Sequence, residues 1–199
     1  MIGETFTSMP TTADSKRSPR ERLLEAATEL FYAEGIQSVG IDRVIERAGV
    51  AKASLYSTFG SKEELVYAYL EERRAKNVSR RRAAVASVDD PVEKILAVFD
   101  SLARDFSRPD FNGCAFTGAM AESPPGGRVD QAAQSFREDI RALFGELAAD
   151  AGAKHPELLA RQLQMLYDGA GSAAKLDRDA ATVAKQVRAA AAALVASAV

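Results

Sequence analysis

Residues 40–65 read GIDRVIERAGVAKASLYSTFGSKEEL, and this stretch carries the strongest structural signal in the chain. Val44 and Ile45 give an apolar face to a short helix that ends at Gly49, because glycine readily takes a positive φ. A second short helix fits Lys52 to Thr58, and Leu55 and the next residue, Phe59, share one face at i, i+4 spacing. Two short helices around a tight turn predict a helix–turn–helix.

The second of these helices leaves a polar face exposed. Its members are Lys52, Ser54, Tyr56, Ser57 and Thr58. Hydroxyl and phenol groups can donate to phosphate oxygens or base edges, and the lysine supplies positive charge. Ala53 is small enough to let the helix approach closely and to contact a thymine methyl group. The helix itself carries no carboxylate, so this face favours DNA binding; a helical hairpin that binds no DNA is the alternative.

Capping signals and glycine stops predict further helices along the chain. Ser18-Pro19-Arg20-Glu21 is a capping box with proline at the first helical position, and Ser61 and Asp90 begin similar signals. With apolar residues at helical spacing, they predict about nine helices, over 19–34, 41–48, 52–58, 61–86, 91–106, 114–122, 128–151, from 155 onwards, and 178–197. No alternating β-branched run predicts a strand. The predicted fold is all-α, a three-helix head followed by a helical C-terminal domain.

Composition excludes several classes of site. The 199 residues contain one Cys and one His, which rules out an intramolecular disulfide, a cysteine-based zinc cluster and a multi-histidine metal site. No catalytic set can be assembled except through His155, which precedes a proline, and no glycine-rich phosphate loop is present. We therefore expect a protein that is not an enzyme and needs no metal or cofactor. No apolar run suits a membrane span or a signal peptide, so we expect a cytoplasmic protein.

The charges are unevenly distributed although the net charge is only −2. Residues 73–82 contain six cations and no acid: Arg73, Arg74, Lys76, Arg80, Arg81 and Arg82. Such a run can contact phosphate or form a solvated helix face, and the sequence leaves both alternatives open. Residues 1–17 are polar and lack periodicity, which predicts a disordered arm.

The stretch from Arg20 to Leu70 closely resembles the DNA-binding domain of TetR-type transcriptional regulators. The resemblance is carried by AATELF at 26–31, Gly35, IDRVIERAGV at 41–50 and AKASLYSTFGSKEEL at 51–65. It implies that the second short helix enters the major groove, with Tyr56 and Lys62 on phosphates. Lys52, Ala53, Ser57 and Thr58 would then face base edges, and Arg43 would touch phosphate or base. Gly40 departs from the family, because many members have a phosphate-binding Thr or Ser there.

After the polar arm 1–17, the resemblance implies a DNA-binding domain 18–65 and an effector-binding and dimerisation domain 66–199. It implies a homodimer that binds a palindromic operator as a repressor and is released by a small, largely apolar effector. An activator of the same fold is one alternative. A helical protein–protein adaptor without sequence-specific DNA binding is another.

Apolar side chains between residues 99 and 167 are candidates for an effector pocket. They are Phe99, Phe106, Cys114, Phe116, Met120, Phe136, Met165 and Tyr167. Apolar walls with few polar groups suit a small hydrophobic ligand, and plain core packing is the alternative. Cys114 would be either an oxidant sensor or a buried inert thiol.

The last two helices are candidates for a dimer interface. Their alanine-rich surfaces allow close helix approach, and the predicted contacts are Leu163, Leu166, Val183, Val187, Ala190, Ala191 and Leu194. Two such helices per chain would form an intermolecular four-helix bundle. The alternative is a helix pair packed inside one protomer.

Overall fold

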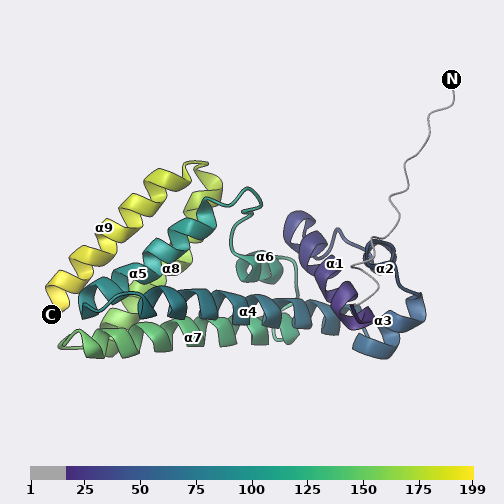
Figure 1. The fold of residues 1–199 in the computed structure, drawn as a ribbon, viewed down its shortest axis with the longest axis horizontal. Coiled ribbons are helices and arrows are strands. Elements are labelled where there is room, and N and C mark those ends of the chain that lie inside the picture. The colour runs from purple at the N-terminus through teal and green to yellow at the C-terminus, as the bar shows by residue number, and fades with distance from the viewer. Residues whose placement is uncertain (1–16) are drawn as a thin grey trace, which may run out of the picture. The chain divides into compact units, whose positions relative to one another are not determined.

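The computed structural model describes residues 17–199, which form nine α-helices and no strand (Figure 1). These are α1 (Pro19–Glu34), α2 (Ile41–Ala48), α3 (Lys52–Phe59), α4 (Lys62–Ala86), α5 (Pro91–Phe106), α6 (Ala115–Ala121), α7 (Arg128–Asp150), α8 (Pro156–Leu176) and α9 (Ala180–Ala198). The all-α prediction is confirmed. Nearly all of the predicted arm, residues 1–16, lies outside the described residues. Within residues 17–199, no helix has both the length and the apolar character needed to cross a membrane.

Helices α1 and α5 begin where a side chain accepts a hydrogen bond from a backbone N–H group of the first turn. The Glu21 N–H donates to Ser18 Oγ at 3.2 Å, and the Glu21 carboxylate accepts from the Ser18 N–H at 2.7 Å. Asp90 caps α5 in the same way, since its Oδ1 accepts from the Glu93 N–H at 2.8 Å. These bonds confirm the predicted caps, which depend only on residues three apart.

The chain divides into two compact units, one ending at Tyr69 and one formed by Leu70–Val199. The division falls inside α4, about one turn beyond the predicted boundary at residue 65. Tyr69 belongs to the first unit because its ring meets the Phe31 ring edge-on, with centroids 5.8 Å apart. The first turns of α4 therefore complete the core of the N-terminal unit.

The N-terminal unit packs α1 against α2 and α3. Leu23, Val44 and Leu55 are fully buried, one from each helix. The turn between α2 and α3 passes through Gly49 at φ 62°, and Arg22 Nη1 donates to the Gly49 carbonyl at 3.2 Å. Because a β-carbon at this φ would be strained, glycine and the Arg22 bond together set the angle at which α3 leaves the turn.

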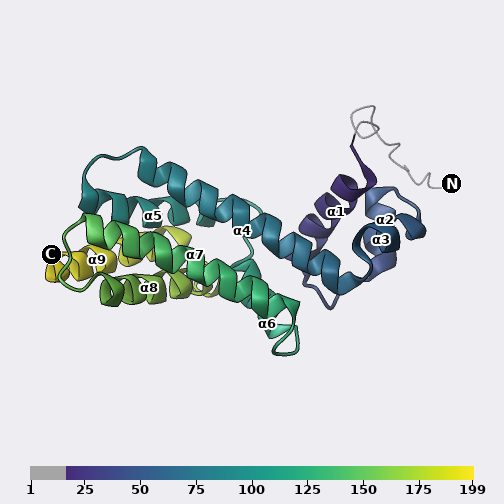
Figure 2. The same ribbon diagram turned by 90° about the horizontal axis from the view of Figure 1, so that it is seen from below.

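The C-terminal unit packs α7 on α8, α8 on α9 and α9 on α5 (Figure 2). Its core contains stacked Phe99 and Phe144 rings, 5.5 Å apart, together with fully buried Ile95 and Leu163. At the surface, Arg188 of α9 donates to Glu93 of α5 at 2.9 Å. The apolar stripes that predicted these helices therefore face one another inside the unit.

Candidate nucleic-acid interface

Helix α3 buries one face in the N-terminal unit and exposes the opposite face to solvent. Leu55 is fully buried, while Phe59 is half-buried with the Arg20 guanidinium 5.6 Å from the centre of its ring. The predicted contact face points outward: Lys52, Ala53, Tyr56, Ser57 and Thr58 are exposed, and Ser54 is half-buried. Tyr56 exposes 48% of its surface, a large fraction for an aromatic side chain. The structure thus brings the predicted α3 residues together on one accessible surface.

Two hydroxyl groups of this face are held by the helix backbone. The Ser54 carbonyl accepts from Ser57 Oγ at 3.1 Å and from Thr58 Oγ1 at 2.6 Å. Both side chains are exposed, and a hydroxyl that donates to the backbone can still accept a hydrogen bond, but donation to a phosphate requires exchange of the intrahelical bond.

Helix α2 contributes a carboxylate to this surface, which the sequence of α3 does not reveal. Lys52 Nζ lies 2.8 Å from Asp42 Oδ1, and this hydrogen bond and charge raise the pKa of the Lys52 ammonium. The prediction of a face without carboxylates rested on the acids of α3 alone. The turn, however, brings the first turn of α2 beside the start of α3, although the two residues are ten positions apart.

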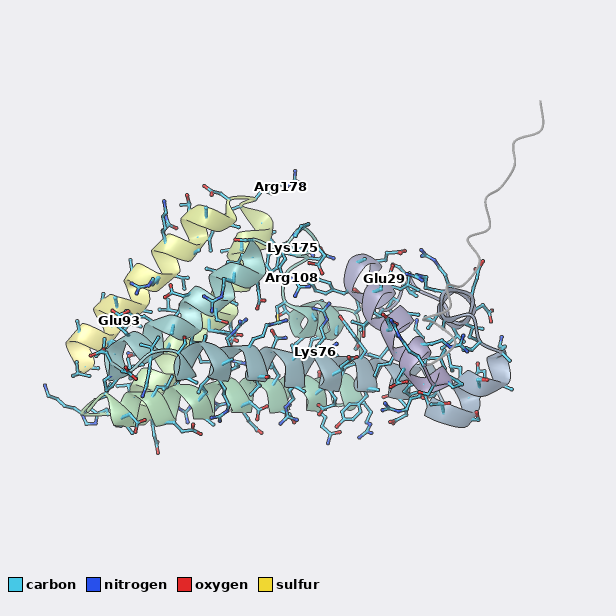
Figure 3. All side chains as sticks on the ribbon, in the orientation of Figure 1. Glu29, Lys76, Glu93, Arg108, Lys175 and Arg178 are labelled. Carbon is cyan, nitrogen blue, oxygen red and sulfur yellow. The ribbon has the colours of Figure 1, made fainter. Side chains whose placement is uncertain are left out.

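The two arginines of α2, Arg43 and Arg47, are also paired with acids. Arg43 forms a two-bond ion pair with Glu34 of α1, which raises the pKa of Arg43 and lowers the pKa of Glu34. Arg47 Nη2 lies 2.7 Å from Glu29, labelled in Figure 3. Exposed pairs of this kind are weak because water and salt screen them, so phosphate can replace the carboxylate.

Lys62 lies at the start of α4, and its side chain contacts other residues of the N-terminal unit. Its ammonium donates to the Ile36 carbonyl at 2.6 Å and lies 6.0 Å from the centre of the Phe31 ring. The side chain is half-buried. In the free protein it therefore ties α4 to the loop before α2.

Most of the predicted pocket aromatics form one buried cluster. The Phe116 and Phe136 rings stack with centroids 4.2 Å apart, and the Tyr167 ring lies 6.5 Å from Phe136 and 6.2 Å from Phe144. Phe99 joins this aromatic cluster through Phe144. The cluster therefore combines side chains from α5, α6, α7 and α8.

The remaining predicted pocket residues are placed differently. Phe106 is buried against Phe111, with ring centroids 5.1 Å apart, and Cys114 is half-buried before α6. Met120 exposes 44% and Met165 exposes 63% of its surface. These two methionines lie on outward faces of α6 and α8, so they do not line the interior of the C-terminal unit as expected.

A buried arginine is the functional candidate that the sequence did not reveal. Arg81 of α4 is 1% exposed; its Nε donates to the Tyr167 hydroxyl at 3.1 Å and its Nη1 to Ser101 Oγ at 2.7 Å. Its Nη2 forms a short ion pair with Asp105. Burial alone would lower the pKa of Arg81, but Tyr167 and Asp105 outweigh it and raise the pKa. Arg81 is therefore a core residue. It neither lies on a solvated helix face nor is accessible to phosphate, the two roles predicted for the cations of residues 73–82.

Neighbouring cations of the run are neutralised within the C-terminal unit. Arg74 Nε lies 2.6 Å from Asp139, and Arg82 Nη1 lies 3.2 Å from Glu146, both acids of α7. These pairs are long-range in sequence, which is why the run appeared unbalanced.

The structure also corrects part of the predicted dimer interface. Leu163, Val183, Val187 and Ala191 are buried within the protomer, where α8 and α9 pack on each other and on α5. They belong to the internal helix pair that was the alternative. Leu166, Ala190 and Leu194 are half-buried and remain accessible to a partner.

Comparisons with known proteins agree with this architecture. The family model of bacterial regulatory proteins of the tetR family matches residues 23–69. The HTH-type transcriptional activator FasR of Mycolicibacterium smegmatis is 36% identical over 94 residues, 47% of this chain and 42% of that protein. The regulator LmrA of Bacillus subtilis is 34% identical over 89 residues, 44% of this chain and 47% of that protein. The chain spans less than half the length of these curated relatives.

Solved structures extend the similarity to both units. A TetR-family transcriptional regulator from Streptomyces coelicolor has a TM-score of 0.85 and 35% identity, covering 90% of this chain and 95% of that one. Reduced E. coli NemR has a TM-score of 0.78 and 25% identity, covering 88% and 95%. The chain belongs to the TetR family of transcriptional regulators, DNA-binding proteins that are not enzymes, and α2 and α3 form its DNA-binding helix–turn–helix.

Proposed function

We propose that this protein is a repressor that binds a palindromic operator as a homodimer and leaves it when a small effector binds the C-terminal unit. The observation that carries the proposal is the exposed face of α3, which presents Lys52, Tyr56 and two hydroxyls above a fully buried Leu55. A rigid helix with this face suits the major groove, with Tyr56 and Lys62 on phosphates. Such a protein acts on chromosomal DNA, so the proposal places it in the cytoplasm.

The dimer in this proposal forms through the outer face of α8. Leu158, Met165 and Leu176 expose 54%, 63% and 78% of their surfaces, and Gly169 is exposed between them. Their spacing places them on one side of the helix, opposite the buried Leu163. An apolar stripe interrupted by a glycine permits close packing of a second helix, and a twofold interface would pair each stripe with its copy. Two heads about 35 Å apart would then read successive major-groove faces.

Helix α4 connects effector binding to the head in this proposal, because residues Lys62–Ala86 form one helix shared by the two units. An effector that moves the part of α4 near Arg81 changes the spacing of the two heads. To reverse a mostly bound population, the effector must favour the released form by about 5 kcal/mol. Comparing the head separation with and without effector tests this step, and an unchanged separation with lost DNA binding would contradict it.

Selection of bound duplexes from a pool of random DNA sequences tests whether the protein binds DNA with sequence specificity. A palindromic consensus is expected, with affinity falling by a log–log salt slope of about −7 for roughly eight phosphate contacts per dimer. No enrichment and little salt dependence would indicate a protein–protein adaptor. Placing the selected site over a promoter in a purified transcription reaction then distinguishes a repressor, which lowers the transcript level, from an activator, which raises it.

A further inference from the structure

We infer that Arg22 of α1 is a positioning residue for base recognition. It holds the turn before α3 in the direction that lets the exposed face of α3 meet the bases, and it acts without contacting DNA itself. This inference rests on the proposed reading of an operator by α3, and it adds a residue on another helix that determines specificity.

The start of α3 depends on contacts from outside the helix. Its N-cap residue is Ala51, whose methyl group cannot accept a hydrogen bond from the backbone. By contrast, Ser18 and Asp90 cap α1 and α5 with side-chain oxygen atoms. Because a first turn without a side-chain cap is held less firmly, the direction of α3 must be fixed by the turn that precedes it.

Arg22 holds that turn from α1. Its Nη1 donates to the Gly49 carbonyl at 3.2 Å, three positions before Lys52, the first residue of α3. On the other side of the same peptide unit, the Val50 N–H donates to the Ile45 carbonyl of α2 at 3.3 Å. The Arg22 Nε is buried, so the guanidinium group lies against the protein. The peptide plane in the turn is therefore held from both sides, by α2 and by α1.

A second side chain of α1 contacts the far end of α3. The Arg20 guanidinium lies 5.6 Å from the centre of the ring of Phe59, the last residue of α3. Between the two ends, Leu55 is fully buried, and α3 packs more on α1 than on α2. Arg20 and Arg22 thus bring α1 to both ends of α3, so α1 sets the direction of the recognition helix.

A small change in this direction is enough to affect base recognition. Helix α3 has eight residues, which makes it about 12 Å long. A tilt of about 10° at the turn would move its far end by about 2 Å, whereas binding groups must lie within about 0.5 Å of their productive positions. Non-specific binding depends mainly on charge and therefore tolerates the same tilt. Loss of the Arg22 bond should thus reduce specificity more than it reduces general DNA affinity.

Arg22→Met tests this role, because methionine keeps an apolar stem and removes the donor. Affinity for the selected operator should fall about tenfold, the effect of one charge-assisted hydrogen bond. Affinity for random duplex should fall only roughly twofold, from the lost charge. Arg22→Lys, which keeps the charge and one donor group, should retain most of the discrimination. Fluorescence anisotropy measures both affinities, and equal losses on the two duplexes would indicate a direct phosphate contact and overturn the inference.

Arg47→Met is the matched control, because it removes one arginine from the same three-helix unit and Arg47 pairs with Glu29 of α1. It should leave the ratio of operator affinity to random-duplex affinity unchanged. If Arg47→Met lowers this ratio as much as Arg22→Met does, the effect is one of net charge and Arg22 is not a positioning residue. Thermal melting confirms that each variant is folded; if Arg22→Met does not fold, Arg22→Gln gives the same comparison.

Hydrogen exchange tests the turn in the absence of DNA. The Ser54 N–H donates to the Ala51 carbonyl at 2.9 Å in the first turn of α3, and it should exchange several-fold faster in Arg22→Met. Faster exchange with full operator discrimination would overturn the role in specificity. A chain that selects no operator would contradict the proposed function, while unchanged exchange at Ser54 would show separately that Arg22 does not hold the turn.

Discussion

Lys52 and Asp42 form an ion pair across the helix–turn–helix, with Lys52 Nζ 2.8 Å from Asp42 Oδ1. Lys52 is the first residue of the helix proposed to enter the major groove, and Asp42 lies in the first turn of the helix before it. Both side chains are exposed, so water and salt weaken the pair and DNA can open it. While closed, the pair directs the ammonium group and places a negative charge near the approaching phosphates.

Replacing Asp42 with Asn should therefore raise affinity for all DNA and reduce discrimination between operator and random sequence. The released Lys52 can reach any phosphate, and repulsion of phosphate by Asp42 disappears. We expect the gain on random duplex to exceed the gain on the selected operator by several-fold. Fluorescence anisotropy over a salt series measures both affinities.

Glu29→Gln is the control for this prediction, because it opens the exposed Arg47–Glu29 pair of the same head and leaves Lys52 unchanged. It should raise both affinities to a similar, small extent. If Glu29→Gln lowers discrimination as much as Asp42→Asn does, the effect comes from net charge and not from the direction of Lys52.

Tyr56→Phe should weaken binding to the operator and to its single-base variants by the same factor. The exposed Tyr56 hydroxyl is proposed to donate to a phosphate, and loss of one such bond costs about 1 kcal/mol, or roughly fivefold in affinity. Titration of a set of operator variants measures the factors. A loss that depends on the base sequence would show that Tyr56 reads a base and not the backbone.

Met165→Glu should separate the dimer into monomers. Met165 is 63% exposed at the middle of the apolar stripe on α8, and a charge there would be buried without a partner in a twofold interface. Sedimentation or light scattering should show the protomer mass, and operator affinity should fall by at least an order of magnitude because two linked heads bind more tightly than one.

Met120→Glu is the matched control for Met165→Glu, since Met120 is an exposed methionine of α6. It should keep the dimer mass and the operator affinity. A dimer that survives Met165→Glu, or is lost equally in Met120→Glu, would show that the outer face of α8 is not the interface.

Arg81→Met should destabilise the C-terminal unit by about 3 kcal/mol, the lower part of the range for a broken buried ion pair. Asp105 would lose its bond to Arg81 but would still have Arg80 at 3.4 Å, which limits the loss. Adding Asp105→Asn should recover part of the stability, because the amide removes the uncompensated charge. Thermal denaturation of the two variants measures this, and equal melting temperatures for Arg81→Met and the unaltered chain would contradict the buried network.

The predictable part of the fold came from short-range chemistry. The Ser18–Glu21 capping box, the Gly49 turn and the Leu55–Phe59 spacing each depend on residues within four positions, so they can be recognised in any chain that contains them. The same spacing placed the hydroxyls and Tyr56 on the open side of α3.

What the sequence determined by itself was the set of helices, the helix–turn–helix and the outward face of α3, because helical periodicity is a local property of the chain. The tertiary structure alone decided which polar side chains pair. Arg81 forms an ion pair with Asp105, 24 positions away, and donates a hydrogen bond to Tyr167, 86 positions away. It also placed Leu163 inside the protomer and Met165 outside, although both are apolar residues of α8. A helix pattern indicates that one face is buried, but the number and direction of the packed neighbours decide how far that burial extends around the helix.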